Sequence, residues 1–244
     1  MIAICMLIVL VAGLVQGTTG FGSALVMVPF LSLIFLPREV VPVTLVLGTF
    51  INIGILVQEY KNVHLKLVIP MFLASAVAIP LGTLMILLIS ADAIRIMIGM
   101  VIIPFAIILF FGWRLELRNE RAASIPAGFL SGLLNGSVTM SGPPLVIFLQ
   151  NQGFEKDRFR ANIAALFLAN NLVTFVTFSL GGLFTVDSLK LSAMFLPAVA
   201  VGLGGGILLA RWLPEGGFRK VALLLLIVAG TSSLISGIIG LSVD

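Results

Sequence analysis

Two short polar stretches interrupt apolar runs of this sequence, and their residue types are suited to holding a small anion. Residues 17–23 read GTTGFGS, and residues 135–142 read NGSVTMSG. Glycines permit tight turns and close approach of the backbone to a ligand, and the neighbouring Ser, Thr, Asn and Gln side chains offer uncharged hydrogen-bonding groups. An apolar run follows each stretch, so a helix that begins there points its unpaired N–H groups and the positive end of its dipole at the break. Such helix starts bind anions without any lysine or arginine.

The candidate substrate-binding residues are the glycines and polar side chains of both breaks, one adjoining phenylalanine and two asparagines inside later apolar segments. They are Gln16, Gly17, Thr18, Thr19, Gly20, Phe21, Gly22, Ser23, Asn52, Asn135, Gly136, Ser137, Thr139, Ser141, Gly142 and Asn171. Ser141 is also a candidate N-cap for the helix that follows it. Close packing between membrane helices is the alternative role for glycines at these positions, but the polar residues gathered at equivalent places in both halves favour a binding site. For Asn52 and Asn171, a hydrogen bond between helices and a contact with the solute are both open.

The composition predicts the setting of these breaks. Of 244 residues, 60% are hydrophobic and 10% are charged, whereas soluble proteins carry about 25% charged residues. Apolar runs of about 20 residues recur along the whole chain, which is the length of a transmembrane helix, and the alternating pattern of a β-barrel is absent. The sequence therefore predicts an all-α integral membrane protein. Inside a membrane, irregular backbone is tolerated only where protein buries it or where it lines a watery cavity.

Other classes of function find little support in the sequence. The net charge of +4 comes from basic residues in short loops, where it reports topology rather than nucleic-acid binding. Cys5 is the single cysteine, and the single histidine, His64, lies in a polar turn with no second metal ligand near it in sequence. We therefore expect no enzymatic activity, no cofactor, no metal and no nucleic-acid partner. The expected partners are a small anionic solute and the lipid bilayer, with a homo-oligomer as an open alternative to a monomer.

A weak internal repeat divides the chain into two halves. Residues 13–18 (GLVQGT) resemble residues 132–137 (GLLNGS) at an offset of 119, and Asn52 and Asn171 share that offset. The halves are predicted as 1–112 and 125–244, joined by a polar connecting loop at 113–124. Each half contains four apolar segments, and a break interrupts the first of them. Internal repeats of this kind are typical of secondary transporters.

The distribution of Lys and Arg indicates how the segments cross the membrane. If each broken segment enters and returns to the same side, eleven of the 14 basic residues share one side and three lie on the other, whereas single crossings throughout give six against eight. The larger asymmetry is typical of a cytoplasmic side. It predicts inverted repeats, each with a glycine-broken, re-entrant-like helical hairpin followed by three transmembrane helices. The connecting loop is then cytoplasmic and both termini are external, together with Arg38, Arg95 and Lys190.

The two pieces of the first broken segment, 2–16 and 21–36, are predicted as half-helices. Each has about 15 residues and a length of roughly 23 Å, which is less than the roughly 30 Å of the hydrocarbon core. Two full crossings per broken segment are the alternative. In that case too the chain returns to the side from which it entered, so the charge distribution is the same.

The first break and the residues after it, GTTGFGSALVMVP at 17–29, resemble the glycine-rich GFG…VP signature of the TauE/SafE family of sulfite and organosulfonate exporters. The length, the duplicated halves and a second glycine-containing break agree with that family over nearly the whole chain. The second break, NGSVTMSGPP, has more hydroxyl groups and fewer glycines than the family's usual form. The resemblance implies a transporter that exports a small sulfur oxyanion or organosulfonate, such as sulfite or sulfoacetate, across a bacterial-type cytoplasmic (inner) membrane.

The positions of the acidic residues favour export. All ten lie in loops or at segment ends, so the sequence offers no carboxylate inside the membrane for coupled proton transport. An inside-negative potential drives anions outward by about 2.3 kcal/mol per charge per 100 mV, and uncoupled export needs no such carboxylate. An importer or channel for a related small anion, and a non-transporting membrane partner of another complex, are the alternatives.

Overall fold

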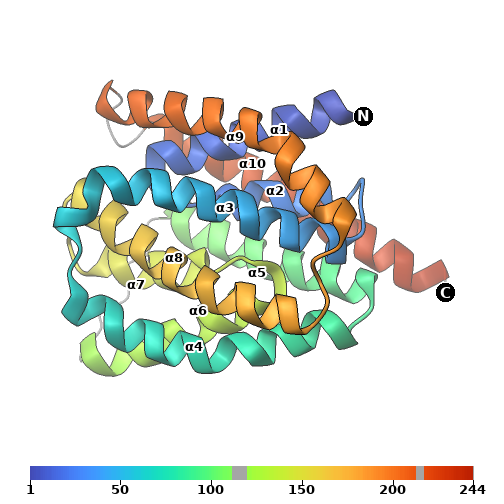
Figure 1. The fold of residues 1–244 in the computed structure, drawn as a ribbon, viewed down its shortest axis with the longest axis horizontal. Helices are drawn as coiled ribbons and strands as arrows, with labels where there is room; N and C mark the ends of the chain where they lie inside the picture. Colours follow the sequence, from blue (N-terminus) through green and yellow to red (C-terminus); the bar gives the residue numbers. More distant parts are fainter. Residues whose placement is uncertain (112–119, 213–216, 244) are drawn as a thin grey trace.

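The structure is a computed structural model that describes residues 1–111, 120–212 and 217–243, and in these parts of the chain the regular elements are all helices (Figure 1). The all-α prediction is confirmed. In chain order the elements are α1 (Ile2–Thr19), α2 (Ser23–Leu31), α3 (Pro37–Glu59), the 3₁₀ helix η1 (Tyr60–Asn62), α4 (Leu65–Leu88), α5 (Ala91–Phe111), α6 (Glu120–Val138), α7 (Gly142–Asn151), α8 (Lys156–Leu180), α9 (Val186–Trp212) and α10 (Gly217–Val243).

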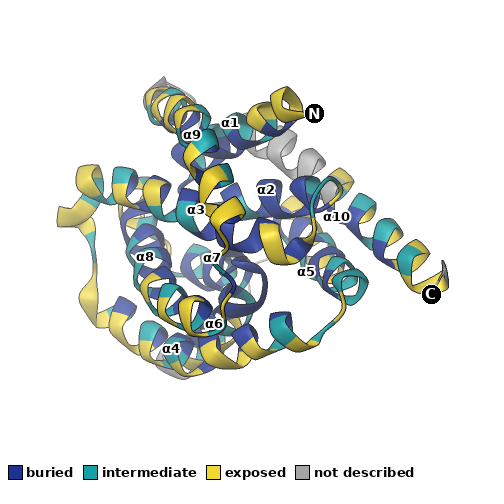
Figure 2. Ribbon diagram, turned by 45° about the vertical axis from the view of Figure 1, so that its right-hand side comes forward, coloured by how far each residue is buried: buried dark blue, intermediate teal, exposed yellow. Residues whose placement is uncertain are grey.

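Six of the described helices are long and apolar enough to cross a membrane: α1, α3 with η1, α4, α5, α8 and α9. The outward faces of the helices are exposed (Figure 2). Many large apolar residues are among those exposed, and Val77, Leu88 and Leu180 are 69%, 79% and 85% exposed. In water such a surface favours aggregation, whereas lipid tails are as apolar as these side chains and solvate them. The chain is therefore a multi-pass membrane protein, as predicted.

The broken segments differ in length from the prediction. The first helix of the first half has 18 residues and the short helix after the break has 9, instead of about 15 each, and α7 in the second half has 10. At 1.5 Å per residue the short helices span about 14–15 Å, half of the roughly 30 Å core. Their length contradicts two full crossings per broken segment. Helix α6 begins at Glu120, and residues 113–119 of the predicted connecting loop lie outside the described part of the chain.

The two halves of the sequence interlock instead of packing as separate bundles. Helix α1 packs along α9, α4 along α6, α3 along α8 and α5 along α10, so each of these long helices has its main partner in the other half. Glycines make the first two contacts possible. A Cβ atom on Gly17 would collide with the α9 backbone at Leu203, and one on Gly136 would collide with the α4 backbone at Ile79. The hydrophobic core lies between these helix pairs.

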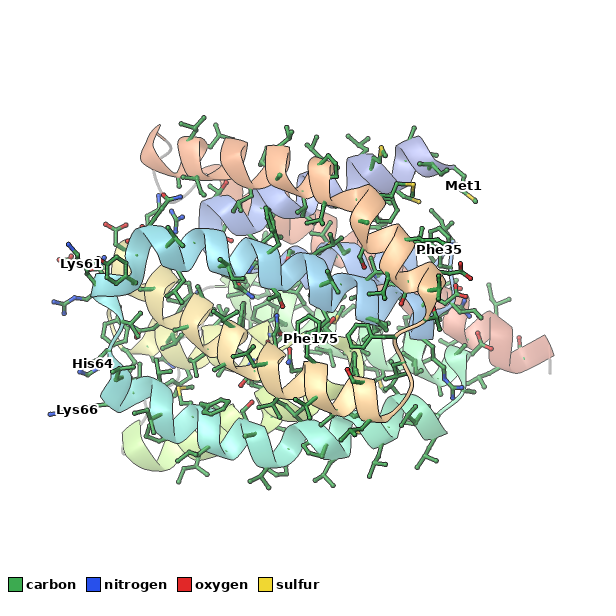
Figure 3. The ribbon with its side chains drawn as sticks, viewed as in Figure 1. Met1, Phe35, Lys61, His64, Lys66 and Phe175 are labelled. Carbon is green, nitrogen blue, oxygen red and sulfur yellow. The ribbon has the colours of Figure 1, made fainter. Side chains whose placement is uncertain are left out.

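One end of the bundle gathers basic residues, and we name it the basic end. The turn that carries Lys61, His64 and Lys66 lies there (Figure 3), and the His64 ring contacts the Phe154 ring just before α8. The ammonium group of Lys156, at the start of α8, donates a hydrogen bond to the Ala210 carbonyl oxygen near the end of α9. His64 is exposed, as predicted for a loop histidine.

The opposite end of the bundle holds other cations and both chain termini (Figure 1). Arg38 donates hydrogen bonds to the carbonyl oxygens of Ile86, Leu87 and Ile89 at the end of α4. Arg95 donates to the Ser32 carbonyl oxygen and forms a salt bridge with Asp92. Among the described cations, this separation of Arg38 and Arg95 from the basic end agrees with the predicted charge distribution.

Candidate functional site

A small cavity lies where the two breaks meet. Its lining comes from the end of α1, the start of α2, the middle of α3, the break before α7 and the middle of α8. About 30 Å³ is open to the centres of water-sized molecules, which is room for a few waters or a solute group of a few heavy atoms. Among the described residues, the lining consists of amide, hydroxyl and apolar groups and includes no Lys, Arg, Asp or Glu. Any charge held there is therefore met by dipoles and hydrogen bonds.

Gln16 organises the first-half wall of the cavity. Its Nε2 donates a hydrogen bond to Asn52 Oδ1 at 2.6 Å, and its Oε1 accepts from the backbone N–H and the hydroxyl of Ser23. The three side chains are each 2% exposed, so these bonds tie α1, α2 and α3 together inside the protein. The Nδ2 group of Asn52 makes no hydrogen bond with a described residue, and Asn52 lines the cavity. Asn52 can therefore offer this N–H₂ group to a solute.

The second half repeats this contact at the offset found in the sequence. Asn135 and Asn171 stand 119 positions after Gln16 and Asn52, and Asn135 Nδ2 donates to Asn171 Oδ1 at 3.4 Å and to Thr174 Oγ1 at 2.7 Å. Asn171 also donates from Nδ2 to Thr49 Oγ1 on α3 at 2.9 Å. The amide of Asn171 therefore bonds residues on two other helices, α6 and α3, through both its oxygen and its nitrogen, whereas the Nδ2 group of Asn52 bonds no described residue.

The backbone turns in the same way at both breaks. The Gly20 N–H donates to the Gln16 carbonyl oxygen at 2.7 Å, and the Thr139 N–H donates to the Asn135 carbonyl oxygen at 2.9 Å. Both residues are left-handed, with φ of 89° at Gly20 and 56° at Thr139. Glycine adopts this conformation freely, but for a β-branched residue it is a rare and strained one. Thr139 lines the cavity, and backbone strain of this kind is concentrated at functional sites.

Two helices start at the cavity. Helix α2 begins after Gly22, whose φ is 103°, and α7 begins after Ser141. The first-turn N–H groups of a helix have no partner within it, so the amides of Ala24 and Leu25 are available beside the cavity that these residues line. Helix α7 offers fewer amides, because Pro143 and the next proline lack an N–H. Helix α2 therefore offers more unpaired N–H groups beside the cavity than α7 does.

The N-cap prediction for Ser141 is confirmed in position. Ser141 is the N-cap residue of α7, but its side chain makes no capping hydrogen bond. Its carbonyl oxygen accepts a hydrogen bond from the Ser131 hydroxyl at 3.1 Å, and its own hydroxyl is left available at the cavity lining. Ser141 therefore contributes a donor to the cavity instead of closing the helix start.

The two halves differ at one position with a consequence for the cavity. Ser23, which bonds Gln16, has Gly142 as its counterpart 119 positions later. Without that hydroxyl, the Oδ1 atom of Asn135 is buried with no hydrogen-bond partner among the described residues. A buried unpaired acceptor is costly. The second half therefore lacks the hydroxyl that completes the amide contact in the first half, and Gly142 lines the cavity at that position.

Half of the predicted binding residues line the cavity. They come from both breaks and from α3 and α8: Gln16, Gly22, Ser23, Asn52, Thr139, Ser141, Gly142 and Asn171. The structure thus brings together residues far apart in the sequence, as the prediction of one site requires. Their role in binding stays a prediction.

The other predicted residues do not line the cavity: Gly17, Thr18, Thr19, Gly20, Phe21, Asn135, Gly136 and Ser137. The hydroxyls of Thr18 and Ser137 bond carbonyl oxygens one turn earlier in their own helices, and that of Thr19 lies 2.7 Å from the Phe21 carbonyl oxygen. The Phe21 ring packs edge-on against the rings of Phe105 and Phe159. In the structure these groups support the breaks, the glycines through helix packing and the hydroxyls through backbone hydrogen bonds.

Sequence reasoning missed Thr44, Gly48 and Phe167, which also line the cavity, together with Ala24, Leu25, Leu45 and Met140. Thr44 and Gly48 precede Asn52 by eight and four residues on α3, and Phe167 precedes Asn171 by four on α8. Residues four apart share a helix face, so this spacing from the two asparagines was the available signal. Gly48 and Phe167 also share the offset of 119. At this equivalent position the first half therefore leaves space at Gly48, whereas the second half has the ring of Phe167.

The described residues contain no group of three or more His, Cys, Asp or Glu side chains that could hold a metal ion, and Cys5 is buried in α1. No curated protein and no solved structure matches the chain. A family profile does match: that of the sulfite exporter family TauE/SafE, over residues 5–233. This match covers nearly the whole sequence and both helix breaks. The chain therefore belongs to the TauE/SafE family of sulfite exporters.

Proposed function

We propose that this protein is a secondary transporter that exports a small sulfur oxyanion or organosulfonate, of the sulfite or sulfoacetate kind, across the cytoplasmic membrane. Membership of the family supports the general function of a membrane exporter of sulfite-like anions. The proposal adds that the anion is held in the cavity between the two helix breaks, near the middle of the bundle.

The observation that carries this proposal is the pair of helix starts at one uncharged cavity. The first-turn amides of α2, the hydroxyl of Ser141 and the Nδ2 group of Asn52 are all hydrogen-bond donors at its wall. A helix N-terminus carries about half a positive charge, and an oxyanion accepts several hydrogen bonds at once. Such a site holds an anion by dipoles, and without a fixed cation it also releases the anion readily.

The lining also supports export over coupled import. No carboxylate or histidine lines the cavity, so the site itself contains no group that could carry a coupled proton. The membrane potential drives an anion outward by about 2.3 kcal/mol per charge per 100 mV. Counterflow of a sulfonate in liposomes with imposed potentials tests the direction. Export predicts faster movement toward the positive side without any proton gradient.

A pair of near-isosteric compounds tests the binding site. We expect methanesulfonate to bind the purified protein. Neutral methanesulfonamide, in which an NH₂ group replaces one sulfonate oxygen, should bind at least about tenfold more weakly. The reason is that helix dipoles stabilise a negative charge, which only methanesulfonate has, although the two compounds are similar in shape. Isothermal titration calorimetry in detergent or nanodiscs measures both affinities. Equal affinities, or no binding of either sulfonate or sulfite, would contradict the proposal.

The proposed orientation follows from the charges. The basic end is cytoplasmic and the end with the termini is external, with the halves as inverted repeats of the plan hairpin plus three helices. In a Cys5→Ala background, Lys61→Cys and Lys190→Cys place exposed thiols at the two ends. We expect a membrane-impermeant maleimide to label Lys190→Cys in intact cells and Lys61→Cys in everted vesicles alone. Labelling of both from the same side would rule out this topology.

A further inference from the structure

Arg160 is a buried cation that neither the cavity nor the interlocking of the halves uses. It is 4% exposed and lies one turn into α8, inside the stretch that is long and apolar enough to cross a membrane. Its Nε and Nη2 atoms are buried without a hydrogen-bond partner among the described residues. Buried arginines in proteins are normally paired, because an unpaired buried charge is very costly.

Among the residues that the structure describes, no acidic side chain pairs with Arg160. The salt bridges between described residues join Arg95 to Asp92 and Lys190 to Asp187, both at the opposite end. Glu59 and Asp157 are near enough to act on Arg160 electrostatically, but neither lies within 4.0 Å of it. The guanidinium therefore presents open donors in a planar fork, the geometry that binds carboxylate, sulfonate and phosphate oxygens bidentately.

Arg160 lies between the basic end and the cavity. Phe167 and Asn171 line the cavity, and Arg160 precedes them by seven and eleven residues on the same helix, which places the three on one face. The rise of 1.5 Å per residue puts Arg160 about 10 Å closer to the basic end than Phe167. Its stem packs under the first break, since a Cβ atom on Gly20 would lie 2.9 Å from Arg160 Cγ.

The first half has no such cation. The counterpart of Arg160, 119 positions earlier, is Val41, which is 0% exposed. The two equivalent positions therefore differ: α8 has a buried guanidinium there, and α3 has an isopropyl group.

We propose that Arg160 is an anion-binding residue on the basic-end side of the cavity. Its free guanidinium donors receive a sulfonate or sulfite oxyanion before that anion reaches the helix starts of α2 and α7. This inference rests on the proposed function and adds an order of binding. The anion meets a fixed charge on the cytoplasmic approach and only dipoles at the cavity, so capture is strong on one side and release is easy on the other.

The test compares Arg160 with a neighbour of the same charge. Arg158 is exposed on the same helix, so Arg158→Gln removes one positive charge from the basic end without touching a buried group. We expect Arg160→Gln to raise the KM for methanesulfonate by at least about tenfold in vesicles that expose the basic end. In vesicles that expose the other end, the KM should change less than about twofold, and Arg158→Gln should change neither value by more than that.

A second variant and a stability measurement separate binding from folding. Arg160→Lys keeps the charge but loses the planar fork, and an intermediate KM from the basic end is expected. If Arg160→Gln does not fold, the KM of Arg160→Lys measured from the basic end replaces it as the test. A raised KM supports the inference, and an unchanged KM overturns it. An unchanged KM in a folded Arg160→Gln also overturns it, whatever the melting temperature. If the parent protein transports no sulfonate, the proposed function itself fails.

Discussion

Replacing Gly48 by valine is expected to weaken sulfonate binding strongly while leaving the fold intact. Gly48 is buried in the middle of α3 and lines the cavity, and no atom lies within 4 Å of the position that a Cβ would take there. The three added carbons therefore fill the space that the solute needs without colliding with protein. Overfilling a well-packed site costs about 1–3 kcal/mol, so the affinity should fall by about five- to 150-fold.

Gly204 provides the matched control for this substitution. It lies on α9, is exposed, and has no atom within 4 Å of an added Cβ. Gly204→Val thus makes the same change in helix propensity away from the cavity and should leave binding unaltered. Gly22 is less suitable, because its φ of 103° strains any side chain. Unreduced methanesulfonate affinity in a Gly48→Val protein with normal thermal stability would place the binding site elsewhere.

Replacing Asn52 by aspartate is expected to suppress anion binding strongly with almost no change in shape. The substitution exchanges the free Nδ2 donor for an acceptor and puts a negative charge on the cavity wall. Two like charges about 5 Å apart repel by about 3 kcal/mol at an effective dielectric constant of 20, or more than a hundredfold in affinity. Gln16 can still donate to the remaining oxygen, as it does at 2.6 Å in the parent. Titration calorimetry with methanesulfonate measures the loss.

Two control variants, Asn52→Leu and Asn171→Leu, show whether charge or structure causes the loss of affinity in Asn52→Asp. Asn52→Leu removes the donor without adding charge, so its loss of affinity should be only several-fold. Asn171→Leu removes the bonds that join Asn171 to Asn135 and Thr49, so it should lower the melting temperature more than the affinity. Equal affinity in Asn52→Asp and the parent at neutral pH would show that Asn52 does not face the bound anion.

The sequence was sufficient for the fold class and for the position of both breaks. Apolar runs report directly that a segment lies in lipid, and glycine and hydroxyl clusters within them report where a helix ends. The counterpart positions of Gln16 and Asn135 were also visible, because a repeat conserves its offset even where the residue types differ. These signals are local or periodic and need no knowledge of which helices touch.

The sequence could not assign the roles of the glycines or the partners of the helices. Gly17 and Gly22 stand in one motif, yet the first packs against α9 and the second starts α2 at the cavity. Gly48 carries no polar group, so nothing in its own identity marks it as cavity lining. Which face of α3 meets α8 depends on contacts across the two halves, and a single sequence does not encode these contacts in any short-range pattern.

Arg160 shows a related limit. In the sequence it stands in one charged stretch with Lys156 and Arg158, just before the apolar residues that begin at Ala161, and the charge count treats all three as loop residues. Hydropathy ends a helix where charges begin, but the backbone of α8 continues through them to Lys156. Helical geometry then places the three cations differently: Arg158 is exposed, Lys156 is partly buried and Arg160 is buried in the interior. Burial of one charge among several neighbours is a property of the helix face and not of composition.

The interlocking of the halves sets a waiting time during synthesis. The hydroxyl of Thr18 on α1 lies 3.3 Å from the Gly206 carbonyl oxygen on α9, across 188 residues of chain. At about 5–20 residues per second, the ribosome needs roughly 10–40 s to supply that partner. Throughout that interval the glycine face of α1 is available to lipid or to another membrane protein. The nascent first half is thus the species on which an insertase or chaperone has the longest time to act.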